Sequence, residues 1–198
     1  MQVSTTQKVC SIEKSIDLNE KYQSVVDRYY MRKFCVDVCE PKDDYSVLIH
    51  SNGVCLISLA PSHSIMKTEK RIKSVSFQVA RDLNRDTGNR VSGKLKHGAQ
   101  KVKPTSPLLV ATFEDGSTMT ARCPINGKLL EVNQRLLTTP GLMISAPDDK
   151  GYIAIILPEQ SIQNVYRESL LSLAQYRDQI SNKKSSLLDT YTKSSNLT

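Results

Sequence analysis

Residues 45–59 read YSVLIHSNGVCLISL, and this stretch decides the fold class. Tyr45–His50 and Val54–Leu59 are rich in β-branched and other apolar residues, which favour strands. Between them lies Asn52-Gly53, a pair that tolerates positive φ and favours a tight hairpin turn. The stretch therefore predicts two antiparallel strands joined by a hairpin.

Strand-like runs recur after this hairpin at a spacing of about ten residues, without amphipathic helices between them. Asp115-Gly116 predicts a second hairpin turn. Short strands at such a spacing are typical of a small β-sandwich or barrel. The further strands are predicted at Ile72–Ala80, Arg90–Lys96, Leu108–Phe113, Ser117–Ala121, Lys128–Val132 and Gly151–Leu157.

From Pro158 onward the pattern changes to that of a helix, because apolar residues recur at steps of three and four. One amphipathic helix is predicted over residues 159–184, and it either packs on the β core or presents its apolar stripe to a partner. The predicted organisation is a flexible N-terminus over residues 1–24, a β-sandwich domain over 25–158, this helix, and a flexible tail over 185–198. The residues at these steps are Ile162, Val165, Tyr166, Ser169, Leu170, Leu173, Tyr176 and Ile180.

Length and hydropathy exclude several classes of protein. A chain of 198 residues suits one domain with tails. No run approaches the 18 or so apolar residues of a membrane span. Residues 1–17 lack the apolar core of a secretory signal. We therefore expect a protein that is neither membrane-embedded nor secreted.

The cysteines and histidines do not form a recognised site. Cys35 and Cys39 have a spacing that zinc ligands tolerate, but no second close pair of ligands follows. Ordinary thiols and surface histidines are favoured over a metal centre built from Cys35, Cys39, His50, Cys55 and His63. No nucleophile elbow, phosphate-binding loop or metalloprotease motif occurs either. We expect no enzyme activity, no metal and no cofactor.

The positive charge is concentrated in one segment. The chain holds 27 Lys and Arg against 20 Asp and Glu, a net charge of +7. Residues 66–103 hold eleven of these basic residues and three acids, so this segment carries +8 and the remainder −1. Three interpretations remain open: a surface for an acidic protein, a surface for nucleic acid, or a solvated face. Phe77, the single aromatic residue of the segment, is poor material for stacking bases.

Five basic residues of this segment are the candidate partner-binding residues. Arg81, Arg85 and Arg90 fall in a predicted loop, from which they reach a partner without disturbing the core. Lys94 and Lys96 lie two residues apart in a predicted strand, so they are expected on one face.

An internal repeat and a first resemblance support a sandwich of two similar halves. Val91–Leu95 matches Ile125–Leu129 at a separation of 34 residues, and each copy is expected to begin a strand. The second copy belongs to Cys123–Asn133, which resembles the segment after the lipoylated hairpin of the glycine cleavage system H protein. The resemblance continues to Gly151-Tyr152-Ile153 and implies a lipoyl/biotinyl-hybrid fold, a flattened β-sandwich. The position of the carrier lysine falls on Gly116, so the carrier chemistry is expected to be lost.

A second set of similar residues is spread over roughly residues 25–158: Val26–Tyr29, Lys33–Cys35, His50–Asn52, Cys55, Ala60, Ser62, His63, Ile72–Ser74, Val91–Lys94, Gly98–Gln100, Glu131–Asn133, Gly151–Ala154, Leu157 and Pro158. In these residues the chain resembles the Abitram (Simiate) family of actin-binding transcription modulators. This resemblance implies a non-enzymatic protein that binds monomeric and filamentous actin and influences filament assembly and cell protrusions. It further implies a transcription-associated role, the transcription machinery as a partner, and residence in nuclear speckles and in the cytoplasm, including cell projections. A nucleic-acid-binding protein or a lipoyl-domain-like adaptor is the alternative.

Overall fold

The computed structural model describes residues 22–195, apart from residue 69. Its pairings between strands are antiparallel, and the prediction of a mainly β protein is confirmed. A flexible N-terminus was predicted over residues 1–24. Residues 1–21 of this segment lie outside the described residues. In order across the sheet, the six-stranded sheet consists of β1 (Tyr30–Cys35), β2 (Tyr45–His50), β3 (Cys55–Leu59), β11 (Ala154–Leu157), β10 (Gly127–Val132) and β7 (Lys101–Val102).

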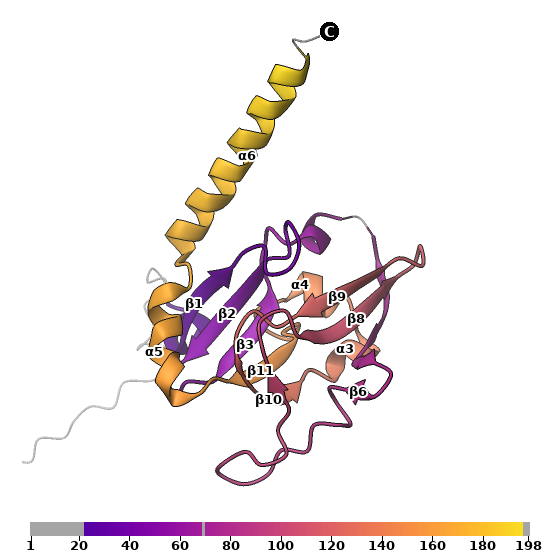
Figure 1. The fold of residues 1–198 in the computed structure, drawn as a ribbon, viewed down its shortest axis with the longest axis vertical. Helices are drawn as coiled ribbons and strands as arrows, with labels where there is room; N and C mark the ends of the chain where they lie inside the picture. Colours follow the sequence, from indigo (N-terminus) through magenta and orange to yellow (C-terminus); the bar gives the residue numbers. More distant parts are fainter. Residues whose placement is uncertain (1–21, 69, 196–198) are drawn as a thin grey trace, which may run out of the picture.

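Two smaller sheets and several helices accompany the six-stranded sheet (Figure 1). The three-stranded sheet has the order β4 (Ile72–Ser76), β8 (Pro107–Phe113) and β9 (Thr118–Arg122), and β5 (Gln78–Ala80) pairs with β6 (Leu83–Asn84). The helices are α2 (Val25–Tyr29), the 3₁₀ helix η1 (Ser64–Lys67), α3 (Arg135–Thr138), α4 (Leu142–Ser145), α5 (Gln160–Ser169) and α6 (Leu173–Ser195). No helix among residues 22–195, residue 69 aside, is long and apolar enough to cross a membrane.

Both predicted hairpins are present. In the β2–β3 turn, Gly53 takes φ +86° and the His50 amide donates to the Val54 carbonyl over 2.8 Å. In the β8–β9 turn, Gly116 takes φ +81°. Positive φ is a conformation that glycine adopts without strain, so these turns follow from the local sequence.

The core lies between the six-stranded and the three-stranded sheets. Tyr45, Val47 and Ile49 alternate along β2 toward this core, and Leu109 and Ala111 of β8 belong to the same buried cluster. A second cluster of Phe34, Ala60 and Tyr176 packs elsewhere. Because apolar burial contributes about 25 cal/mol per Å², the two sheets are held together mainly by these side chains.

The prediction of a strand at Arg90–Lys96 is wrong. The chain turns there instead, with Gly93 at φ +64° and Lys96 at φ +54°, and Ser92 bridges to His97. The two copies of the repeat therefore differ in structure, because only Ile125–Leu129 enters a strand. The predicted strand Ile72–Ala80 is divided into β4 and β5, and β1 was not predicted.

The prediction of one continuous C-terminal helix is also wrong. The chain leaves α5 after Ser169, and Leu171 forms an antiparallel bridge with Phe34 at the edge of β1. The Leu171 carbonyl accepts from the Phe34 amide over 2.9 Å, so the edge of the sheet takes the hydrogen bonds that a helix would use. Ser172 then caps α6, because its amide donates to Gln175 Oε1 over 2.8 Å and its hydroxyl accepts from the Gln175 amide.

The stripe of the predicted helix is divided between packing and exposure. Tyr166 and Leu170 pack against the main core, and Tyr176 and Ile180 belong to the second cluster. Val165 and Leu173 are exposed. Beyond this contact α6 rises away from the sheets, as Figure 1 shows, and it continues to Ser195 where a flexible tail from residue 185 was predicted.

Candidate functional site

The loop of residues 85–100, between β6 and β7, is held against the body by side-chain amides. The Asn89 amide donates to the carbonyls of Leu129 and Leu130 on β10, over 3.0 and 3.2 Å. Its oxygen accepts from the Gln100 backbone amide over 2.8 Å. Long loops inside a compact domain are uncommon unless they are functional or disordered. This one is ordered by specific hydrogen bonds, and it descends at the lower end of the molecule in Figure 1.

Arg85 is buried. The prediction that it is exposed in a loop, from which it reaches a partner, is therefore wrong. Arg85 is 5% exposed, with Nε donating to the Pro107 carbonyl over 2.9 Å and Nη1 to Gln100 Oε1 over 2.8 Å. Burial lowers the pKa of its guanidinium, because desolvation disfavours the charged form. Arg85 therefore ties the loop to β8 and is not free to contact a partner.

The other four candidate residues lie at or near the surface. Arg81, Arg90 and Lys94 are exposed and Lys96 is half-buried. The prediction that Lys94 and Lys96 share one face of a strand fails, since both belong to the turn described above. None of the four makes a salt bridge within the part of the chain that the structure describes.

Residues 90–98 form a short hairpin-like projection, which we call the finger. Ser92 and His97 exchange two backbone hydrogen bonds of 2.9 Å, and the Lys96 amide donates to the Gly93 carbonyl over 3.2 Å. Gly98, at φ +77°, passes so close to the Arg90 carbonyl that a Cβ there would lie 2.0 Å from its oxygen. Leu95 lies at the tip, where its side chain is 67% exposed.

Lys128 extends the positive surface, and sequence reasoning missed it. It belongs to β10, yet its Nζ donates to the Leu95 carbonyl over 2.9 Å. With Lys101 and Lys103 it lines a hollow of about 350 Å³ next to Glu159. A separation of 33 residues hid the contact with Leu95, and no local pattern marks it. The resulting surface, called the basic face from here on, consists of Arg90, Lys94, Lys96, Lys101, Lys103 and Lys128.

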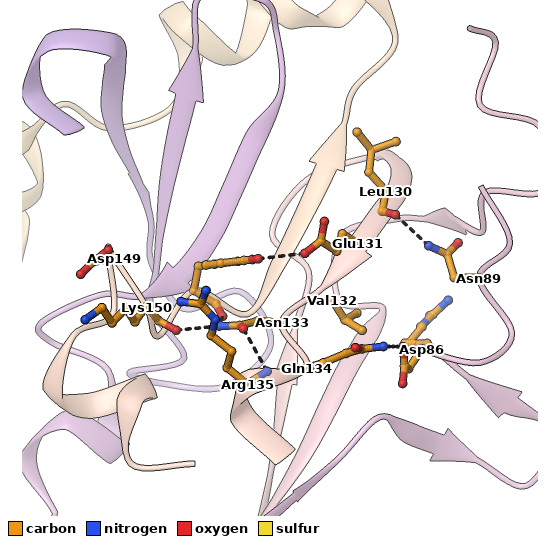
Figure 2. Close-up of a pocket in the computed structure, with 12 residues that line it drawn as sticks. Asp86, Asn89, Leu130, Glu131, Val132, Asn133, Gln134, Arg135, Asp149 and Lys150 are labelled. Atoms are coloured by element: carbon orange, nitrogen blue, oxygen red, sulfur yellow. Dashed lines mark hydrogen bonds between the residues drawn. The ribbon is translucent and has the colours of Figure 1, made fainter. Parts of the chain in front are cut away.

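A polar pocket of about 630 Å³ lies beside the root of the same loop. Figure 2 shows Asp86 and Asn89 on one side of it, Asp149 and Lys150 on the other, and Glu131–Arg135 between them. Gln134 Nε2 donates to Asp86 Oδ1 over 2.8 Å. Burial and the Glu131 carboxylate raise the pKa of the Tyr152 phenol to about 12, and this phenol donates to Glu131 over 3.0 Å.

The pocket is lined by charged side chains of both signs. Its described lining contains three basic and three acidic residues but no serine, threonine, cysteine or histidine. The charged lining residues are Arg85, Arg135, Lys150, Asp86, Glu131 and Asp149.

The position expected for a carrier lysine is the glycine at the tip of the β8–β9 hairpin, Gly116. Lys70 reaches this tip from another segment, and its Nζ lies 2.6 Å from Asp115 Oδ2 and 3.3 Å from Ser117 Oγ. An ion pair and a hydrogen bond therefore engage its amine. The tip itself carries no amine for an amide linkage.

The candidate zinc ligands are dispersed. Cys55 is buried in the main core, Cys39 is exposed, and His63 is buried, so its predicted surface position is wrong. His63 Nδ1 accepts from the Ile65 amide over 3.2 Å, which caps η1. Within residues 22–195, residue 69 aside, no three His, Cys, Asp or Glu side chains come together as metal ligands.

The cysteines should differ sharply in reactivity. Burial raises the pKa values of Cys35, Cys55 and Cys123 to about 12, so little thiolate is present at pH 8. We expect iodoacetamide at pH 8 to alkylate the exposed Cys39 ahead of Cys35, Cys55 and Cys123, which should react at least about 100-fold more slowly until denaturant is added. Peptide mass spectrometry over time measures this. Alkylation of Cys55 at the rate of Cys39 in the native protein would contradict the described core.

Comparison with known proteins finds relatives over most of the chain. Protein Abitram of Xenopus tropicalis is 39% identical over 159 residues, which cover 80% of this chain and 86% of the relative. Protein Abitram of Homo sapiens is 38% identical over 78% of this chain and 86% of the relative. Protein Abitram of Drosophila melanogaster is 36% identical over 85% and 75%. No protein-family model matches the chain.

Among solved structures, a glycine cleavage system H protein from Mycobacterium marinum is similar. The TM-score is 0.46 at 12% sequence identity, and the match covers 70% of this chain and 92% of that protein.

Proposed function

The chain belongs to the Abitram family, and we propose that it is a non-enzymatic, actin-binding protein. It binds monomeric and filamentous actin and modulates filament assembly and cell protrusions. In the nucleus, including nuclear speckles, it has a second, transcription-associated role. Actin is the proposed partner because the resemblance of residues 25–158 to this family implies it, and the nuclear role has the same basis.

The observation that carries the proposal is the basic face. Six cationic side chains gather on an ordered loop, on or just after β7, and on β10, and none of them makes a salt bridge within the described residues. A surface of one sign accelerates encounter with a partner of the opposite sign and favours correct orientation. Actin is an acidic protein, so the basic face is the proposed docking surface.

Two features support a binding role over a carrier or an enzyme. The hairpin tip has a glycine, Gly116, where a carrier needs a lysine amine. The large polar pocket offers hydrogen-bonding and charged groups, and its described lining has no serine, cysteine or histidine. Both features suit a protein that functions by binding a partner.

Sedimentation with actin filaments tests the proposal. We expect the protein to pellet with filaments in a saturable manner, with binding weakened roughly fivefold between about 50 and 200 mM salt, because salt screens exposed charges. A parallel titration with monomeric actin tests the second form. Failure of the wild-type chain to bind either form at low salt would reject actin as the partner. A gel shift of RNA or DNA at physiological salt in the same preparation would favour the nucleic-acid alternative.

A further inference from the structure

The finger carries an apolar side chain at a place where the fold gains nothing from it. Leu95 follows Lys94 in the middle of the turn from Gly93 to Lys96, and its exposure of 67% is the highest for a large apolar side chain in the described residues. Turn positions favour Gly, Asn, Asp and Ser, each for a local conformational reason that leucine does not share. A single exposed leucine is ordinary on a surface, so its setting has to carry the argument.

The backbone beneath Leu95 is held in one conformation. The two hydrogen bonds between Ser92 and His97 close the base of the finger. The Leu95 carbonyl accepts from Lys128 Nζ, which ties the tip to β10. Asn89 fixes the root to the same strand. A side chain presented on an ordered turn loses less conformational freedom on binding than one on a mobile loop.

The surroundings of Leu95 are cationic. Lys94 and Lys96 flank it in the sequence, and Lys128 contacts its carbonyl. Binding energy at interfaces is concentrated in a few apolar or aromatic anchors, with a polar rim that excludes water around them. An apolar tip within a basic rim fits an acidic protein surface that has a recess for one leucine side chain. A membrane fits less well, because stable membrane anchoring takes more than one weak apolar contact.

We propose that Leu95 is the apolar anchor of the basic face and inserts into a recess on the acidic surface of the partner protein. The inference rests on the proposed function for the choice of actin as that partner. The other contacts of the basic face are made by exposed charges, which salt screens. The apolar contact of Leu95 is not screened by salt. The anchor and the charges are therefore separable by experiment.

The test compares Leu95→Ser with Leu137→Ser, a matched change at a leucine on α3 that is 47% exposed. Binding to actin filaments is measured for both full-length variants at low and at high salt, together with their thermal unfolding. We expect Leu95→Ser to weaken binding at least about tenfold at both salt concentrations, because the lost contact is apolar. Leu137→Ser should bind like the wild type, and neither change should lower the unfolding temperature.

The outcomes separate the inference from the proposed function. Wild-type binding that Leu95→Ser leaves unchanged overturns the anchor and leaves actin binding standing. No binding by the wild type overturns both. The same variants are tested for flotation with vesicles of phosphatidylserine and phosphatidylcholine. Flotation that depends on Leu95, without an effect of Leu95→Ser on actin binding, would assign the finger to a membrane and overturn the protein recess.

Discussion

Reversing Arg90, Lys94, Lys101 and Lys103 to glutamate together should weaken binding to actin filaments by about 100-fold at low salt. All four side chains are exposed, so the fold should tolerate the change. The reversals lower the net charge from +7 to −1, and they place like charges opposite an acidic partner. As the Debye length shortens from about 10 Å at 0.1 M salt to about 3 Å at 1 M, the difference from the wild type should shrink. Sedimentation with filaments across a salt series measures both effects.

A matched variant separates the position of the charges from their sum. Lys67, Lys73, Arg177 and Lys184 are also exposed, and they lie on η1, β4 and α6 instead of the loop. Reversing these four gives the same net charge. We expect this variant to retain binding within about fivefold of the wild type, since its charges are distant from the proposed contact. Equal losses in the two variants would mean that overall charge governs binding and that the basic face is not the docking surface.

Replacing Asp44 with alanine should lower the free energy of unfolding by about 3 kcal/mol. Asp44 is 1% exposed, and its carboxylate accepts from the Asp37 amide over 2.8 Å and from the Ser62 hydroxyl. The Ser62 hydroxyl in turn accepts from the Tyr176 phenol over 2.6 Å. Alanine would leave the buried Ser62 hydroxyl and the Asp37 amide without their acceptor, and an unsatisfied buried donor costs more than the hydrogen bond itself contributes. For a domain of this size the unfolding temperature should fall by about 6–12 °C.

This network connects α6 to the body, so two further variants define what it does. Tyr176→Phe removes the phenolic hydroxyl but keeps the ring, which stacks on Phe34 at a centroid distance of 4.1 Å. We expect a loss of about 1–1.5 kcal/mol for this variant, with faster amide exchange at the start of α6. Asp82→Ala, at an exposed position after β5, is the control and should be neutral. An Asp44→Ala protein within about 0.5 kcal/mol of the wild type would contradict the described network.

The hairpins show what short-range information decides. Asn52-Gly53 and Asp115-Gly116 reverse the chain by local conformational preference, and the apolar runs beside them are long enough to be buried strands. These elements are present where the sequence predicts them. Residues 91–95 and 125–129 nevertheless share a pattern and adopt different structures. Gly127 packs against Ile156 and Leu157 as β10 pairs with β11, whereas Gly93 has open space around it and turns. A strand forms only where a neighbouring strand pairs with it, and the local sequence pattern does not specify which strand that is.

For the candidate site too, some properties follow from the local sequence and others from long-range contacts. The concentration of charge in residues 66–103 is a property of the sequence and needs no structure. Which of those charges face solvent was decided by long-range contacts. The buried Arg85 is held by hydrogen bonds to Pro107 and Gln100, and β10 brings Lys128 to the finger.

The C-terminal helix was likewise divided by a distant element, since the edge of β1 takes up Leu171. The sequence by itself determined the β class, the two hairpin turns and the sign and location of the charge, because these depend on residues close together in the chain. Only the tertiary structure decided the burial of Arg85, the basic face and the break before α6. Each of these depends on hydrogen bonds between residues far apart in sequence.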